Sequence, residues 1–273
     1  AVTPVANFEP INLSGTIVKR ASLHNSDQIE RLGLRIGDYV YVEKGGEIIP
    51  KIVGIDKLRR GSLDNLVKFI EYCPECGSKL EKVEGEAQHY CKDENNCKTQ
   101  IIGKIQHFAS RKAMNIESLG SERVALLFNR GIINNIADIY KIEVEKLTNL
   151  EGMAEKSALN LIESIKESKK QPFQKVLFSI GIRHVGETVA SKLANHFGSI
   201  ENLINSSYDD LVSVEEIGKK IVKSISRYFK NSQNLLIIEK LSKAGINFKI
   251  EKNKKKSNIL NGKTFVISGT FEN

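Results

Sequence analysis

The 273-residue sequence contains no tryptophan, and aromatic residues make up only 7% of it. Stacking of bases on aromatic side chains is therefore a weak basis for binding single-stranded nucleic acid. No apolar run approaches the ~20 residues that cross a bilayer, and no secretory signal is recognisable, so we expect no membrane segment. A P-loop, a dinucleotide fingerprint, a nucleophile elbow and a zinc-protease motif are also missing, which leaves no convincing catalytic nucleophile.

Cysteine is scarce as well, and the four cysteines lie close together in the sequence, at Cys73, Cys76, Cys91 and Cys97. This number and spacing indicate a metal site rather than a disulfide framework. Four thiolates on short turns suit tetrahedral Zn²⁺, and because they fill every position, the metal is expected to be structural. His89 is a possible substitute ligand that we interpret as a bystander. The alternative is a set of unrelated buried thiols.

Charge is plentiful, and it is unbalanced. Lysine and arginine number 41 against 33 aspartate and glutamate residues, which gives a net charge of +8 and an isoelectric point near 9.1. A basic balance favours nucleic acid or another anionic surface as a partner, without deciding between them.

An internal repeat organises the second half of the chain. Four segments align on Gly120, Ala154, Gly186 and Gly218, which lie 34, 32 and 32 residues apart. Apolar residues recur four and one positions before the aligned residue, and four and seven positions after it. The later two positions share one stripe of a helix, and the earlier two anchor the preceding segment on the same core. Each unit is therefore predicted to be a helix, a hairpin and a second helix.

The hairpins suggest a way to hold a phosphate. The small aligned residue is expected to supply the backbone freedom of a tight turn, and the N–H groups that open the second helix favour an anion. This resembles the helix-hairpin-helix motif, which grips the DNA backbone without reading bases. The alternatives are a helical bundle whose glycines only permit close packing, and ordinary surface charge at the side chains. The candidate DNA contacts here are Gly120, Gly152, Arg183, His184, Gly186, Gly218 and Lys219.

The part of the chain before the cysteines is typical of β structure. Short strands, one helix and glycine turns suit a small closed barrel of the OB type. The helix is expected to have its cap near Ser26 or Asp27, and Pro50 inside the third strand argues for an edge or a bulge. The predicted elements are strands at residues 15–18, 38–42 and 47–55 and a helix at 26–32.

Several short strings resemble the bacterial NAD-dependent DNA ligases. The strings that resemble the OB domain of that family are TPVA at 3–6, EP at 9–10, ASLHN at 21–25, RIGD at 35–38 and IIP at 48–50. The cysteine spacing and GIRHVG at 181–186 fit the same family, and GKTFVISGT at 262–270 resembles the first strand of a BRCT domain. The implied domains are an OB-fold domain at 1–67, a zinc finger at 68–102, an all-α helix-hairpin-helix domain at 103–250, a linker at 251–259 and the start of a BRCT domain at 260–273.

The resemblance implies an activity that this chain does not carry alone. The family seals nicks in duplex DNA: a lysine takes AMP from NAD, AMP passes to the 5′-phosphate, and the 3′-hydroxyl displaces it with the help of Mg²⁺. That lysine belongs to a Lys-x-Asp-Gly motif in an adenylation domain, and the motif is absent here. We therefore expect the C-terminal part of such a ligase, which is inactive by itself and begins where the adenylation domain would end.

The implied partner is nicked double-stranded DNA, held by backbone contacts without sequence specificity. The implied protein is a monomer in the bacterial cytoplasm, associated with the nucleoid. The other interpretation is a non-catalytic repair scaffold that shares the repeats.

The resemblance also implies contacts from the OB domain to the minor groove beside the nick. A loop of the family that contributes to catalysis maps to residues 44–50, where Arg-Ala-Gly-Asp is usual. Lys44 and Glu47 keep the charge signs, but a lysine cannot make the bidentate phosphate contact of an arginine. Ala154 departs from the hairpin glycine, so the second hairpin is expected to be a spacer. The candidate contacts in the OB domain are His24, Asn25, Lys44, Glu47, Ile48 and Ile49.

Overall fold

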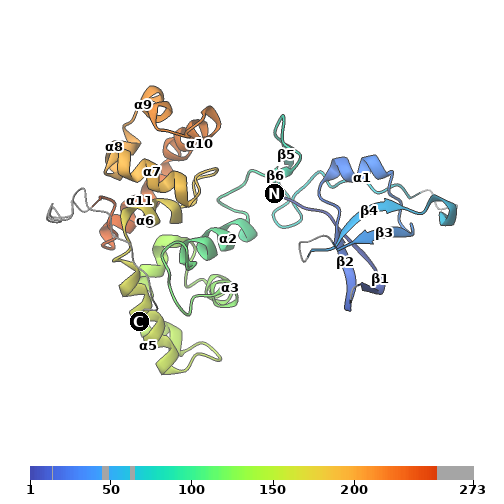
Figure 1. The fold of residues 1–273 in the computed structure, drawn as a ribbon. Coiled ribbons are helices and arrows are strands. Elements are labelled where there is room, and N and C mark those ends of the chain that lie inside the picture. Colours follow the sequence, from blue (N-terminus) through green and yellow to red (C-terminus); the bar gives the residue numbers. More distant parts are fainter. Residues whose placement is uncertain (14, 45–48, 62–64, 251–273) are drawn as a thin grey trace, which may run out of the picture. The chain divides into compact units, whose positions relative to one another are not determined.

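The computed structural model describes residues 1–13, 15–44, 49–61 and 65–250 (Figure 1). The chain divides into two compact units, one ending at Gly103 and the other beginning at Lys104, and each is considered by itself. The expected linker and BRCT strand lie outside the described residues, and so do Glu47 and Ile48.

The first unit contains one four-stranded sheet in the order β1-β2-β4-β3. Its strands are β1 (Val5–Leu13), β2 (Thr16–Ser22), β3 (Val40–Glu43) and β4 (Lys51–Ile55). β1 and β3 pair antiparallel with β2 and β4 respectively, and β2 and β4 are parallel. Register shifts in β1 and β3 bend the sheet into a half-barrel. This curled sheet fits the predicted OB-type architecture, although no pairing of β3 with β1 closes the ring within the described residues.

The longest strand, β1, was not predicted. Its sequence, VANFEPINL, is interrupted by Pro10, which cannot donate to a strand ladder. The register with β2 shifts between Asn7 and Ile11, so the proline sits in an irregular stretch that the ladder tolerates. A strand that contains a bulge is not detected by the alternation of apolar and polar residues, because the period of two is broken at the extra residue.

The short helix of this unit is confirmed at its predicted position, α1 (Ser26–Leu32), but its cap is not. Asn25 is the N-cap, and its side chain accepts a hydrogen bond from the Gln28 amide at 3.0 Å. Pro50 is also placed differently from the prediction: it precedes β4, and its carbonyl accepts from the Ser22 amide at 2.8 Å. A 3₁₀ turn, η1 (Lys57–Arg59), follows β4. The buried core of the sheet and helix consists of Ala21, Leu23, Ile29, Leu34 and Ile52.

The rest of the first unit is a small hairpin of β5 (Leu80–Lys82) and β6 (His89–Cys91). The helix α2 (Lys98–Ala109) runs across the border between the units. The elements of the second unit are α3 (Ser121–Asn129), η2 (Ile136–Lys141), α4 (Val144–Thr148), α5 (Glu155–Ser168), α6 (Phe173–Ser179), α7 (Glu187–Phe197), α8 (Ile200–Ile204), α9 (Tyr208–Ser213), α10 (Lys219–Lys230) and α11 (Ser232–Lys243). None of the described helices is long and apolar enough to cross a membrane.

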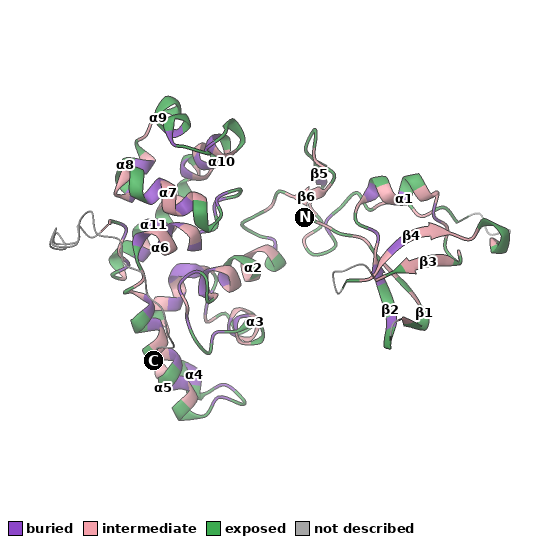
Figure 2. Cartoon of the chain, in the orientation of Figure 1, coloured by how far each residue is buried: buried purple, intermediate pink, exposed green. Residues whose placement is uncertain are grey.

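The core of the second unit is built from the repeat positions (Figure 2). The residues at the four apolar offsets are buried in all four repeats. They are Ile116, Leu119, Val124 and Leu127 in the first repeat; Leu150, Met153, Ala158 and Leu161 in the second; Ile182, Val185, Ala190 and Leu193 in the third; and Val214, Ile217, Val222 and Ile225 in the fourth. At about 25 cal/mol for each Å² of apolar surface removed from water, such a shared pattern explains why the units pack together. The predicted repeat is therefore confirmed as the organising feature of this unit.

Candidate zinc site and nucleic-acid interface

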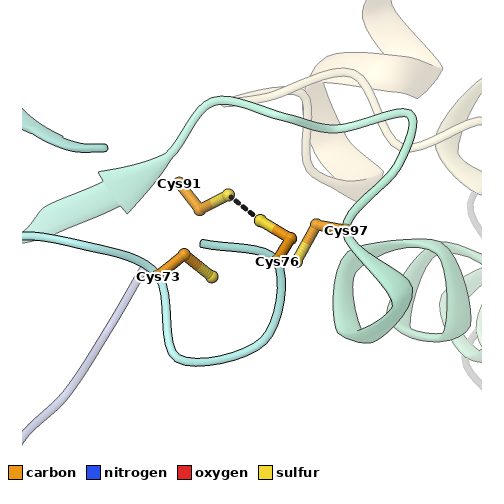
Figure 3. A group of neighbouring side chains, drawn as sticks. All are labelled: Cys73, Cys76, Cys91 and Cys97. Carbon is orange, nitrogen blue, oxygen red and sulfur yellow. Dashed lines mark hydrogen bonds between the residues drawn. The ribbon is translucent and has the colours of Figure 1, made fainter. Parts of the chain in front are cut away.

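The four cysteines converge on one point (Figure 3). Cys73 and Cys76 lie on a turn in which the Gly77 amide donates to the Cys73 carbonyl at 2.9 Å. Gly77 has a φ of +71°, a conformation that glycine adopts without strain. Cys91 ends β6, and Cys97 directly precedes α2. The four sulfur atoms lie within 4.8 Å of one another, so elements distant in sequence supply one set of ligands.

The chemistry of these sulfur atoms fits a divalent cation. Zn–S bonds of about 2.3 Å in a tetrahedron separate sulfur atoms by about 3.8 Å, and the Cys76 and Cys91 sulfur atoms are 3.5 Å apart. Hydrogen bonding with Ser78 lowers the pKa of Cys76 to about 7, whereas desolvation raises the pKa of Cys91 to about 12. Desolvation also raises the pKa of Cys97. Four thiolates at this separation need a cation between them, and Zn²⁺ supplies the charge and the geometry.

His89, the possible substitute ligand, lies beside the cluster. Its ring packs against Phe69, with centroids 4.6 Å apart. The ligand group found among the described residues consists of the four cysteines. Every position of a tetrahedral ion is thereby taken by protein, which leaves none for a substrate and makes the metal structural.

The second candidate site is made by the helix-hairpin-helix repeats, which we name hairpins 1 to 4. Their aligned residues Gly120, Ala154, Gly186 and Gly218 are the N-caps of α3, α5, α7 and α10. None of the four caps makes a side-chain hydrogen bond, and neither do the caps of α4 and α6, Glu143 and Pro172. The helices α8, α9 and α11, by contrast, are capped by Ser199, Ser207 and Asn231 respectively. The amides that open a helix have no carbonyl four residues earlier in that helix to bond, and this arrangement favours an anion at the helix N-terminus.

The structure corrects the reason for the hairpin glycines. Gly120, Gly186 and Gly218 have φ values of −73°, −81° and −81°, which any residue adopts. A Cβ added at any of them would meet nothing within 4 Å. The left-handed residue lies two positions earlier in each hairpin, with φ values of 63° at Ser118, 78° at Gly152, 66° at His184 and 65° at Glu216. The fold therefore does not need glycine at the aligned position, and the open space there would admit the close approach of a ligand.

The other candidates in this unit fall into two groups. Lys219 opens α10, and Arg183 and His184 lie in hairpin 3, all exposed beside the uncapped amides. Gly152, by contrast, provides the left-handed turn of hairpin 2. Hairpins 1 and 2 border a cleft of about 550 Å³, whose lining includes Ser118, Gly120, Arg123, Leu126 and Gly152.

The described candidates of the OB domain make separate contacts. Asn25 is occupied in capping α1, and the His24 carbonyl accepts from the Gln88 side chain at 3.0 Å. Lys44 donates to the Thr16 hydroxyl at 3.0 Å, and Ile49 is exposed.

Sequence reasoning missed two basic residues beside Lys44. A shallow groove of about 240 Å³ is lined by Lys44 together with Lys19 and Arg20 of β2. Ile17 lines the same groove and is 75% exposed. The available signal in the sequence was the basic pair Lys19-Arg20 directly after the strand predicted at residues 15–18.

Comparison with known families matches each part of this description. The model of the NAD-dependent DNA ligase OB-fold domain matches residues 1–63, and that of the NAD-dependent DNA ligase C4 zinc finger domain matches residues 72–98. A SAM-like helix-hairpin-helix tandem matches residues 110–167, and a helix-hairpin-helix motif matches residues 175–238. The two helical matches cover hairpins 1 and 2 and hairpins 3 and 4 respectively.

Curated relatives match the chain from end to end. Proteins named DNA ligase from Flavobacterium psychrophilum, Christiangramia forsetii and Phocaeicola vulgatus are 54%, 55% and 55% identical over 274, 274 and 273 residues. These matches cover 99% or 100% of the chain but only 41% of the length of each relative. The chain therefore belongs to the NAD-dependent DNA ligase family, of which it carries the OB-fold, C4 zinc-finger and helix-hairpin-helix domains.

Proposed function

We propose that this chain is the DNA-holding portion of an NAD-dependent ligase that seals nicks in duplex DNA. The observation that carries the proposal is the set of uncapped helix N-termini whose glycines the fold does not require. Amides at such positions bind phosphate oxygens whatever base is attached, so the contacts are independent of sequence. The net charge of +8 favours the same partner.

The chemistry of sealing belongs to a longer protein in this proposal. The Lys-x-Asp-Gly motif that would take AMP from NAD is absent from the sequence. NAD and Mg²⁺ are accordingly cofactors of the intact ligase, and this chain contributes the grip on DNA around the nick. The intact enzyme would act as a monomer on the chromosome, hence in the cytoplasm with the nucleoid.

Within this proposal the hairpins differ in their roles. The amides that follow Gly120, Gly186 and Gly218 bind phosphate, with Arg183 and Lys219 adding charge. Hairpin 2 is a spacer, because Ala154 places a methyl group where the other repeats leave space. In the OB domain, Lys44 with Lys19 and Arg20 forms a basic groove for the backbone beside the nick.

Valine substitutions at the hairpin glycines test the proposal. Gly186→Val and Gly218→Val fill space that the fold leaves open, so helical content should be unchanged while affinity for nicked duplex falls. Loss of one phosphate contact should also reduce the slope of log K against log salt by about 1. Ala154→Val is the matched control at the same position of hairpin 2, and it should bind like the parent. Folded glycine variants that bind nicked DNA as well as the parent at every salt concentration would show that these hairpins only pack.

A further inference from the structure

Two polar contacts join hairpin 3 to hairpin 4, both within the second unit. His184 Nδ1 lies 2.9 Å from the Ser224 hydroxyl of α10. Lys192 Nζ of α7 lies 2.9 Å from a carboxylate oxygen of Glu216. Each contact links the turn of one hairpin to the second helix of the other, across 40 and 24 residues of sequence respectively.

The repeat relates the two contacts to each other. His184 and Glu216 each lie two positions before the aligned glycine of their own hairpin, at the left-handed residue of the turn. Lys192 and Ser224 each lie six positions after the aligned glycine of theirs. In both contacts, the residue two positions before the glycine of one hairpin meets the residue six positions after the glycine of the other. The link is therefore reciprocal. A link of this kind fixes both the separation and the relative rotation of two hairpins, whereas a single contact would leave a hinge.

The chemistry of each contact is specific. The Ser224 hydroxyl donates its proton to the Lys220 carbonyl at 3.1 Å, so its oxygen accepts from His184 Nδ1–H. The hydrogen bond to Glu216 and the nearby charge of Glu215 raise the pKa of Lys192, which keeps the lysine charged. The Lys192 side chain is only 27% exposed, against 64% for Glu216.

Hairpins 1 and 2 do not use the corresponding positions in this way. The residue two positions before Ala154 is Gly152, and the residue six positions after Gly120 is Leu126. Neither has a polar side chain, and both line the cleft of about 550 Å³ between these hairpins. The reciprocal polar link is thus specific to the second pair of hairpins.

We propose that His184, Ser224, Lys192 and Glu216 are positioning residues that lock hairpins 3 and 4 into one rigid grip on two backbone phosphates. This inference rests on the proposed function, in which the hairpin amides hold DNA. Two sites on a rigid frame bind together at a high effective concentration, because the second contact needs no further ordering of the protein. The lock makes hairpins 3 and 4 a fixed reference for the duplex.

Glu216→Gln tests the lock against simple electrostatics. The substitution removes a negative charge next to a DNA-binding hairpin, so charge alone would strengthen binding to nicked duplex. If Glu216 positions the hairpins, affinity should instead fall, by up to roughly 5-fold, which is the upper end of the coupling in an exposed ion pair. Glu201→Gln in α8 makes the same charge change away from the lock and is the control. The exchange Lys192→Glu with Glu216→Lys keeps the net charge and re-forms the pair, so it should restore most of the affinity.

A distance measurement separates positioning from a general loss of structure. Spin labels at Asn195 of α7 and Arg227 of α10 report the separation of the two helices; encoded non-cysteine labels are needed because the cysteines hold zinc. The distance distribution should broaden in Glu216→Gln and narrow again in the exchanged pair, at constant helical content. Binding by Glu216→Gln that equals that of Glu201→Gln would overturn the lock. The valine variants at Gly186 and Gly218 leave the four lock residues unchanged. If these variants lose affinity for nicked duplex while Glu216→Gln does not, the lock is rejected and the proposed function stands.

Discussion

Removal of the Arg60 guanidinium should strongly destabilise the first unit. Arg60 donates two hydrogen bonds to the Asp38 carboxylate, at 2.7 and 2.8 Å, and one to the Gly33 carbonyl at 2.8 Å. The Asp38 side chain is 2% exposed. After Arg60→Ala, this buried carboxylate would keep the hydrogen bond from the Arg35 amide, at 2.7 Å, but lose both hydrogen bonds from the guanidinium. Removing one partner of such a shielded pair is strongly destabilising, and each kcal/mol lost lowers the melting temperature of a unit of this size by roughly 4–8 °C, so a drop of roughly 10 °C or more is expected.

The effect should depend on pH in a defined direction. The hydrogen bond from Arg60 is the largest cause that lowers the pKa of Asp38 below its ordinary value. A carboxyl group whose folded pKa is depressed stabilises the fold above the unfolded pKa of about 3.9, and that contribution is lost as the pH falls through the folded pKa. The difference in stability between the parent and Arg60→Ala should therefore be full near pH 7 and shrink below about pH 4.

Hydrogen exchange of the β2 and β4 amides measures this effect without interference from the helical unit. Arg59→Ala is the matched control, because Arg59 is 70% exposed and meets Asp56 at 3.6 Å. A surface pair of that kind contributes about 0–1 kcal/mol, so the control should keep nearly all of its protection. Equal losses of protection in the two variants would refute the reasoning, and so would a difference that does not change between pH 7 and pH 3.

Two further predictions concern the zinc site and the turns. Metal analysis should find one zinc for each chain. Cys97→Ser or chelation of the metal should unfold the β5–β6 hairpin while the helical signal of the second unit persists. A zinc-free protein of unchanged stability would contradict the assignment. Gly152→Ala should destabilise the second unit by about 1 kcal/mol, because its φ is +78°, whereas Gly120→Ala, at a φ of −73°, should not. Equal thermal unfolding of these two alanine variants would show that the left-handed turn carries no strain.

The repeat and the cysteine cluster could be predicted from the sequence because both are encoded by spacing. Each buried position of a repeat is set by the period of its own helix, so the pattern around Gly186 or Gly218 is readable without its neighbours. Metal ligands on short turns are likewise local in sequence, and the spacing of Cys73 and Cys76 by itself predicts a pair of metal ligands on one turn. The helix at Ser26–Leu32 is another local signal, although its N-cap was misplaced by one residue.

The tertiary structure decided what depends on how separate elements meet. The bulged strand β1 exists because β2 pairs with it on both sides of the irregularity, and no local pattern contains that information. The left-handed residue of each hairpin is not the small residue that the alignment emphasised, since Ser118, His184 and Glu216 take that conformation against their own preference. Contacts such as Asp38 with Arg60 and His184 with Ser224 join residues 22 and 40 positions apart. The sequence by itself determined which faces are buried, and only the packing of those faces determined which polar groups come within hydrogen-bonding distance.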